Sequence, residues 1–143
     1  MSSTRTDDTV SSGSLSLRLP SDVTAPAVAR HSIRTALDRY GIRGQVADDV
    51  LLATSELVTN AFEHGGTPDR LELACSGSRV RLRVFDSGVG TPRLKTPSPA
   101  TARSRGLYLV DMLAEDWGFE RYENGTKYVW AEFLVYPDDQ VIG

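Results

Sequence analysis

The sequence is poor in residues that form disulfides or bind zinc, with one cysteine and two histidines among 143 residues. The single cysteine, Cys75, has no internal disulfide partner, and no Cys/His cluster has the spacing of a zinc site. Neither Cys75 nor any serine lies in a nucleophile elbow, so a hydrolase triad has no support. Cys75 lies in an alternating apolar run, and we expect it to pack in the core.

Long apolar and long basic runs are also missing from the sequence. No apolar stretch approaches the roughly 18 residues of a membrane-spanning helix, and the polar N-terminal segment has no apolar signal region. The net charge is −3, which gives no electrostatic indication of nucleic-acid binding. We therefore expect a cytoplasmic protein that binds no membrane and makes no direct contact with nucleic acid.

The composition itself is that of a globular domain. Hydrophobic residues make up 40% of the chain and charged residues 24%, near the average of folded proteins. The length suits a single domain with a sizeable core. We expect a flexible N-terminal tail over residues 1–14, one folded domain over 15–136 and a short C-terminal tail over 137–143.

Apolar periodicity predicts the element order β-α-α-β-β-loop-α-β-β. Alternation with period two indicates strands, and apolar stripes at helical spacing indicate helices. Ser76-Gly77-Ser78 and Asn124-Gly125 are turn signals that predict two hairpins. The order predicts an α+β fold, a two-layer sandwich whose mixed, mostly antiparallel sheet has helices on one face. The expected strands are 15–19, 71–75, 80–85, 117–122 and 127–136, and the expected helices are about 25–40, 45–64 and 106–114.

The second expected helix has three polar residues, Glu56, Asn60 and His64, at intervals of four. This spacing places them on roughly one helix face, apart from the apolar stripe. Asn60 offers a neutral oxygen of the kind that Mg²⁺ accepts, and Glu56 could orient or deprotonate an attacking hydroxyl. The alternative is a solvated polar face, which is common on amphipathic helices.

A two-glycine turn, Asp86-Ser87-Gly88-Val89-Gly90, follows the second strand of the first hairpin. An aspartate at a strand end can accept a hydrogen bond from an exocyclic amine such as that of adenine. Glycines permit positive φ and let the backbone approach a ligand closely. The alternative is an ordinary turn that Asp86 caps through its own side chain.

The segment 91–105 has no periodicity, contains three prolines, and leads into Arg105-Gly106-Leu107 at the start of a helix. Its length suggests a lid or a binding loop. Backbone N–H groups at a helix start bind phosphate, and Lys95, Arg103 and Arg105 could close on it. The alternative is a surface loop with scattered charges. Neither a Walker A loop nor a Rossmann fingerprint is present.

The three motifs, in this order, resemble the N, G1 and G2 boxes of the GHKL (Bergerat-fold) ATPase superfamily. Gly125-Thr126, before the last expected strand, resembles the short fourth box. The resemblance covers about residues 15–135. The residues that carry it are Glu56-Leu57-Val58-Thr59-Asn60-Ala61-Phe62-Glu63-His64-Gly65, Asp86-Ser87-Gly88-Val89-Gly90 and Arg105-Gly106-Leu107-Tyr108-Leu109-Val110.

The resemblance implies an ATP or ADP site whose adenine end is formed by the second and fourth boxes. Asp86 would recognise adenine, Gly88 and Gly90 would act as hinges of a lid, and Thr126 would lie near the adenine. The family fold is the α+β sandwich that the element order predicts.

At the phosphate end, the resemblance gives Asn60 the role of Mg²⁺ ligand and Glu56 that of general base. Arg105, Gly106 and Leu107 would hold the phosphates. His64 is typical of the family's first box, where it would have a positional role near the helix end.

Among GHKL proteins, the small chain is most similar to anti-sigma-factor serine/threonine kinases of the RsbW type. Ala114–Gly118 and Val129–Phe133 are similar to the matching runs of many actinomycete members. The resemblance implies a sigma factor and a STAS-type anti-anti-sigma factor as partners, phosphorylation of the latter on serine or threonine, and a possible homodimer. One departure is Ser104, where many relatives have glycine. It favours an alternative, a non-catalytic ATP-binding module that sequesters a partner.

Overall fold

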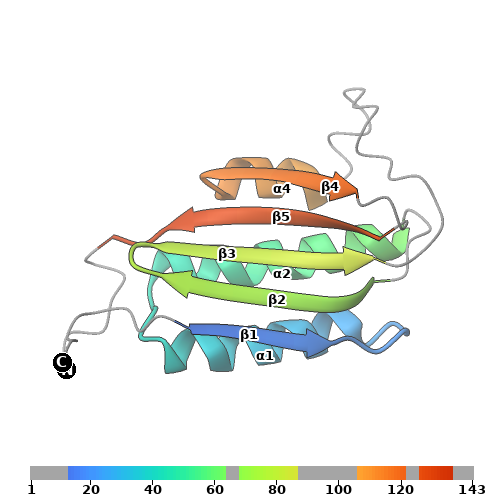
Figure 1. Cartoon of the computed structure of the whole chain (residues 1–143), viewed down its shortest axis with the longest axis horizontal. Coiled ribbons are helices and arrows are strands. Elements are labelled where there is room, and N and C mark those ends of the chain that lie inside the picture. Colours follow the sequence, from blue (N-terminus) through green and yellow to red (C-terminus); the bar gives the residue numbers. More distant parts are fainter. Residues whose placement is uncertain (1–12, 64–67, 87–105, 122–125, 137–143) are drawn as a thin grey trace.

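The computed structural model describes residues 13–63, 68–86, 106–121 and 126–136 of the chain (Figure 1). The described elements are β1 (Gly13–Arg18), α1 (Ala25–Arg39), α2 (Gln45–Glu63), β2 (Pro68–Ser76), β3 (Arg79–Asp86), α4 (Gly106–Leu113), β4 (Asp116–Arg121) and β5 (Lys127–Leu134).

The five strands form one sheet in the order β1-β2-β3-β5-β4. All four pairs of neighbours are antiparallel, so the described part of the sheet contains no parallel pair. A tight turn at Gly77 and Ser78 joins β2 to β3, and Gly77 has a φ of 58°, a left-handed conformation that favours glycine. The last strand, β5, lies between β3 and β4, and so brings residue 127 beside residue 86.

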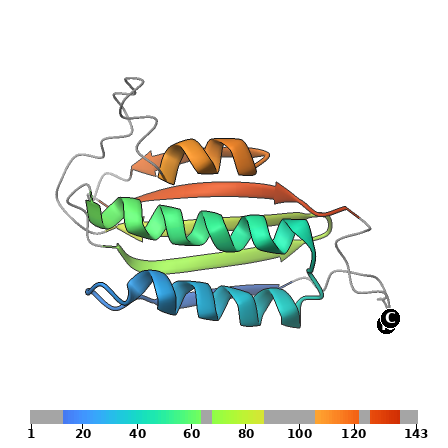
Figure 2. The same cartoon turned by 180° about the vertical axis from the view of Figure 1, so that it is seen from behind.

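The helices α1, α2 and α4 all cover the same face of the sheet, as Figures 1 and 2 show from opposite sides. Strand residues therefore alternate between this helix-covered face and an open face. The central helix α2 contacts both α1 and α4 as well as β2, β3 and β5. The largest fully buried side chains lie between the two layers: Ile33, Leu37, Ile42, Val50, Val58, Leu71, Leu73, Val80, Leu82 and Val110.

Helix α1 begins where Asp22 and Thr24 fix the chain. The Thr24 backbone N–H donates to Asp22 Oδ1 at 2.8 Å, and the Thr24 hydroxyl donates to the same oxygen. These bonds, the hydroxyl bond first, lower the pKa of Asp22 below its ordinary value. Pro26 then occupies the first helical turn, where no backbone donor is needed.

Cys75 lies on the helix-covered side of β2 and is 2% exposed. Burial raises the pKa of its thiol from 9.0 to about 12, because the apolar core disfavours a thiolate. The expectation that Cys75 packs in the core is confirmed.

The predicted fold, an α+β two-layer sandwich with helices on one face, is confirmed by this arrangement. The elements lie close to the expected ranges, although β1 begins at Gly13, inside the expected N-terminal tail. The other residues of the two expected tails, and the turn at Asn124-Gly125, lie outside the described residues. No helix within the described ranges is long and apolar enough to cross a membrane.

Candidate functional site

Four element ends meet at one end of the sandwich, the right-hand end in Figure 1. They are the C-terminal end of α2, the end of β3, and the starts of α4 and β5. Asn60 lies in the last turn of α2, Asp86 ends β3, Gly106 begins α4 and Thr126 immediately precedes β5. The fold therefore brings together motifs that are far apart in the sequence.

Several predicted site residues cannot be placed here. Gly88, Gly90 and Arg105 lie outside the described residues, as do His64, Lys95 and Arg103. Leu107 belongs to α4, but its side chain is also outside the described part. The roles expected for these residues stay predictions.

Asn60 is buried, with an exposed fraction of 7%. Counting along the helix places it near Ala53 and Leu57, which are both buried, at the border of the core-facing side. Its Oδ1 is buried and has no hydrogen-bond partner among the described residues. A solvated polar face therefore does not describe Asn60. Most buried polar atoms have a partner, so an oxygen left over at a helix end suits a ligand or a cation.

Glu56 lies one helical turn before Asn60 and is half-buried. The spacing places its side chain beside that of Asn60 on the helix surface. The Glu56 side chain is partly exposed to solvent, whereas Asn60 is enclosed. The pair thus offers one buried neutral oxygen and one accessible carboxylate at the same end of α2.

Asp86 forms an ion pair with Lys127, with 3.7 Å between Oδ2 and Nζ. The side chains are only 14% and 8% exposed, so the pair is largely removed from water. The register of β3 and β5 places the two residues directly opposite each other. Both side chains lie on the helix-covered face of the sheet. Val84 on β3 and Val129 on β5 are two residues away from them and lie on the same face, because strand residues alternate between faces.

Lys127 was missed by the sequence analysis. Nothing in its local sequence distinguishes it from an ordinary strand-start lysine. Its partner Asp86 lies 41 positions earlier (127 − 86), and only the β3–β5 register joins them. A buried lysine is uncommon, and its burial beside a carboxylate indicates a charged site rather than a solvated strand end.

The donor set suits magnesium bound through a nucleotide better than a protein metal cage. Among the residues that the structure describes, no three His, Cys, Asp or Glu side chains are grouped to hold a metal ion. Mg²⁺ commonly keeps several waters and takes its other ligands from substrate phosphates and one or two protein oxygens. The single orphaned oxygen of Asn60 fits that pattern.

The start of α4 completes this end of the molecule. Gly106 is its first residue, and the first N–H groups of a helix have no partner within the helix. Val110, one turn further on, is fully buried and holds α4 against the core. The helix start is therefore fixed at the same end as Asn60 and Asp86, with the polarity that favours an anion.

The sequence matches the family described as "Histidine kinase-like ATPase domain" over residues 19–133. The chain belongs to this family. The matched range includes every described residue of the candidate site. No curated protein matches the sequence.

Two solved structures share the fold of this histidine kinase-like ATPase domain. One contains the RsbU and RsbW domains of Rv1364c from Mycobacterium tuberculosis, with a TM-score of 0.66 and 23% identity, covering 91% of this chain. This chain spans only 35% of that one. The other is the SiaB–SiaC complex from Pseudomonas aeruginosa, with a TM-score of 0.50, 12% identity, and coverage of 85% of this chain and 89% of that chain.

Proposed function

We propose that this chain is an ATP-binding anti-sigma regulatory factor that phosphorylates a STAS-type anti-anti-sigma protein on serine or threonine. The observation that carries the proposal is the orphaned buried oxygen of Asn60, at the same end of the sandwich as the buried Asp86. Membership of the histidine kinase-like ATPase family supports a nucleotide at this place. The fold shared with a structure of RsbU and RsbW domains supports the regulatory role.

In this proposal, the adenine lies against β3 and β5. The Asp86 carboxylate accepts a hydrogen bond from the exocyclic amine of adenine, and Thr126 lies near the same end. Gly88 and Gly90 act as hinges of the lid that follows β3. Lys127 holds the Asp86 carboxylate in position through the ion pair.

The phosphates lie between α2 and the start of α4. Asn60 is a ligand of Mg²⁺, while Arg105, Gly106 and Leu107 bind the phosphates through a side chain and backbone N–H groups. Magnesium, when bound, neutralises charge on the phosphate oxygens.

Glu56 is the proposed general base. It takes the proton from the partner's hydroxyl as the hydroxyl oxygen attacks the γ-phosphorus. The bond from that phosphorus to the β–γ bridging oxygen breaks, and ADP leaves with the bonding electron pair. The half-buried position of Glu56 lets a protein substrate approach it.

Nucleotide binding is tested by calorimetry with Mg-ATP on two variants that break the same ion pair. Asp86→Asn removes the charged acceptor and is expected to weaken binding by about 1.5–3 kcal/mol. Lys127→Met breaks the ion pair but keeps the carboxylate, and a smaller loss is expected. Equal losses in the two variants would show that the ion pair, and not the adenine contact, determines affinity.

Phosphotransfer is tested with labelled ATP and purified candidate STAS proteins. Glu56→Gln is expected to slow transfer by about 10²–10⁴-fold while ATP affinity stays unchanged. Asp49→Asn is the matched control, because it makes the same carboxylate-to-amide change two turns earlier on α2. Undiminished transfer by Glu56→Gln would exclude Glu56 as the base.

The second candidate function is a non-catalytic ATP-binding module that sequesters a sigma factor or another partner. Ser104, where many similar proteins have glycine, favours it. The same experiments separate the two functions. Stabilisation by ATP in a thermal titration, together with no transfer by the unaltered chain to any STAS protein, would support the module.

A further inference from the structure

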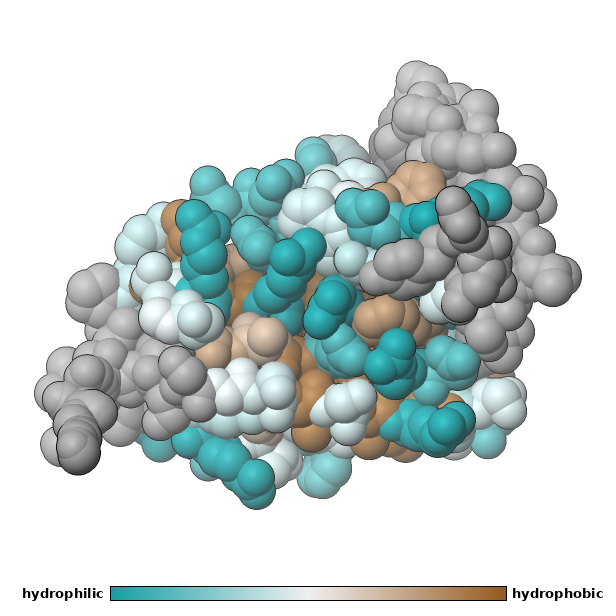
Figure 3. Space-filling model, in the orientation of Figure 1, coloured by the Kyte–Doolittle hydropathy of each residue, from teal (hydrophilic) through white to brown (hydrophobic). Residues whose placement is uncertain are grey.

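The open face of the sheet has a concentration of arginines on its first three strands. Arg18 on β1, Arg70 on β2, and Arg79, Arg81 and Arg83 on β3 occupy open-face positions, opposite in alternation to the core leucines. We call these five residues the arginine face. Figure 3 looks onto this side of the molecule and shows hydrophilic residues running across it, with hydrophobic residues visible between and beneath them.

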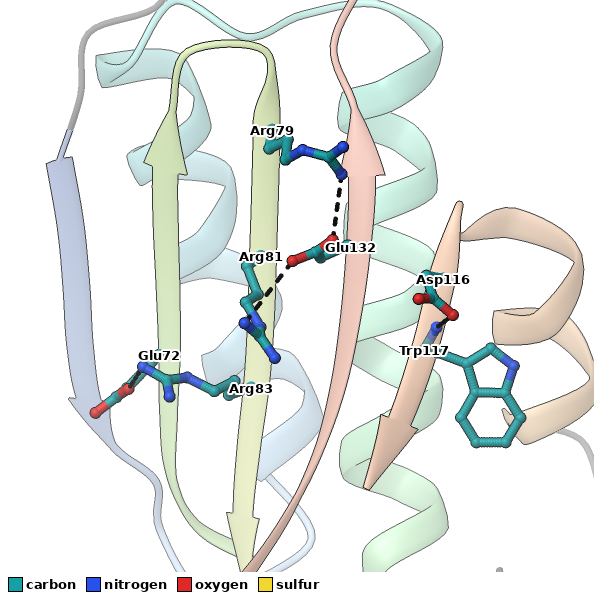
Figure 4. Close-up of polar contacts among 7 residues, drawn as sticks. All are labelled: Glu72, Arg79, Arg81, Arg83, Asp116, Trp117 and Glu132. Carbon is teal, nitrogen blue, oxygen red and sulfur yellow. Dashed lines mark hydrogen bonds and ion pairs between the residues drawn. The ribbon is translucent and has the colours of Figure 1, made fainter. Parts of the chain in front are cut away.

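Two glutamates lie within the arginine face, and each contacts two guanidinium groups. Figure 4 shows these contacts except that of Arg70. Glu72 is 2.7 Å from Arg70 and 2.7 Å from Arg83. Glu132 is 3.3 Å from Arg79 and 3.8 Å from Arg81. Four arginines thus share two carboxylates, and Arg18 adds a fifth positive charge.

The exposed fractions place the positive charge outermost. The glutamate side chains are 22% and 23% exposed, whereas the paired arginines are between 33% and 58% exposed. A molecule approaching this face meets guanidinium groups first. The far edge is different, because β4 places the exposed acidic residues Asp116 and Glu120 on the same side of the sheet.

Aromatic rings beneath the arginines hold several guanidinium groups in place. Arg70 lies 4.0 Å from the centre of the Phe85 ring, and Arg81 lies 4.8 Å from that of Trp130. Arg83 lies over both the Phe85 and the Tyr128 ring, 5.7 and 5.5 Å from their centres. Such stacking restricts the long side chains before any partner binds, so less conformational entropy is lost on binding.

The Trp130 ring lies close to β4 because residue 118 is glycine. A Cβ atom at Gly118 would be 3.0 Å from the indole ring. Phe85 and Tyr128 are only 5% and 8% exposed. These two rings therefore support the arginines from below and are not available to stack against the bases of a nucleic acid.

We propose that the arginine face binds an acidic, extended segment of a partner protein. Arg79, Arg81 and Arg83 are two residues apart on one strand, which spaces them by about 6.6 Å. An extended segment with a carboxylate at every second position has the same spacing. Guanidinium groups have five N–H donors, so each can bind such a carboxylate while keeping its contact with Glu72 or Glu132.

A second copy of the chain does not suit this face. A two-fold contact would place the arginine face against itself, and the excess positive charges would repel each other.

The arginine face lies on the side of the sheet opposite the helices, whereas Asn60 and Asp86 belong to the helix-covered side. The proposal therefore goes beyond the proposed function and does not depend on nucleotide binding.

The test is an NMR titration of the isotope-labelled full chain at low salt with the blocked peptide Thr-Glu-Thr-Glu-Thr-Glu-Thr. We expect amide shifts along β2 and β3 and none along α1. The matched peptide with glutamine in place of glutamate is expected to cause none at the same concentration. Shifts from both peptides, or none from the acidic peptide up to about 1 mM, would overturn the proposal.

Arginine variants then test which positive charges bind the peptide. Arg79→Gln with Arg81→Gln is expected to raise the peptide Kd about fivefold. Arg34→Gln with Arg39→Gln makes the same charge change at exposed positions on α1 and is expected to change it less than about twofold. If removing Arg81 loosens the fold around Trp130, Arg18→Gln with Arg79→Gln replaces the first pair. Equal weakening by the α1 pair would overturn the proposal.

Two further outcomes would also overturn it. One is tighter binding of a single-stranded oligonucleotide than of the acidic peptide on the same strands. The other is a dimer in sedimentation that dissociates in the Arg79→Gln, Arg81→Gln variant. The ATP affinity of every variant is measured in parallel and expected to be unchanged, so a failure here is distinct from a failure of the nucleotide site.

Discussion

The two faces of strand β3 use charge in different ways. On the helix-covered side, the charged residue Asp86 forms a largely buried ion pair with Lys127. On the open side, the three arginines of β3 pair with two partly buried carboxylates, and Arg81 and Arg83 also stack on aromatic rings. Buried pairs have few alternatives to their native partner, whereas exposed networks exchange partners with water and salt. A buried pair of this kind therefore fixes the geometry of a site, whereas an exposed network suits recognition of a partner.

The largest expected effect comes from breaking the buried pair. Asp86→Asn leaves the Lys127 ammonium in a dry position without its carboxylate, and should destabilise the fold by about 3–5 kcal/mol. Urea unfolding measures the change. The double variant Asp86→Asn, Lys127→Met should recover most of the loss, since no charge is then left buried. If Asp86→Asn unfolds at the same urea concentration as the unaltered chain, the buried ion pair stabilises the fold no more than the exposed network does.

The next effect compares neighbouring positions on β3. Leu82 is fully buried, and Leu82→Ala should cost about 2–5 kcal/mol of unfolding free energy because it leaves a cavity. Arg79→Ala, on the open face of the same strand, should cost less than about 1 kcal/mol. Chemical denaturation of both variants gives the comparison. Similar losses would mean that the arginine face contributes to the stability of the core.

A smaller effect is expected from Glu132→Gln, which removes a carboxylate shared by Arg79 and Arg81. The loss of stability should stay below about 1 kcal/mol and should shrink as salt is added, because salt screens exposed charges. Thermal unfolding at low and high salt measures it. A loss that is independent of salt would indicate packing rather than charge as its cause.

The last comparison concerns the reactivity of Cys75 at pH 8, where no change in the stability of the fold is expected. Burial raises the pKa of Cys75 to about 12, so the native thiol should resist a thiol reagent at pH 8 and react once the chain is unfolded in urea. Between pH 9 and 12, the unfolded chain ionises at this thiol and the native chain does not, so stability should fall as pH rises through that range. Cys75→Ala should remove that part of the pH dependence. Rapid labelling of the folded chain at pH 8 would contradict the dry character of the helix-covered side.

The fold was predictable because its signals are local. Period-two alternation from Leu71 to Phe85 and the Ser76-Gly77-Ser78 turn are sufficient to predict the central hairpin. The strand order was not predictable in the same way. The insertion of β5 between β3 and β4 depends on long-range pairing, which no local pattern encodes.

The candidate site was predicted through its motifs rather than its contacts. Asp86 and Asn60 stood out because they belong to motifs, but the burial of Asn60 depends on how α2 packs against the sheet. Lys127 and the partners of the arginine face were missed for one shared reason. Opposite residues on antiparallel strands meet only through register, and register is fixed by the whole sheet.

The alternation of β3 also constrains how this chain can change over time. One inserted or deleted residue between Arg83 and Asp86 would turn the strand by one position, moving the aspartate to the open face or the arginines into the core. Such a mutation would remove either the buried ion pair or the arginine face in a single event. Substitutions can change each of these two features separately and keep the other, so we expect the length of this segment of β3 to vary little where both are retained.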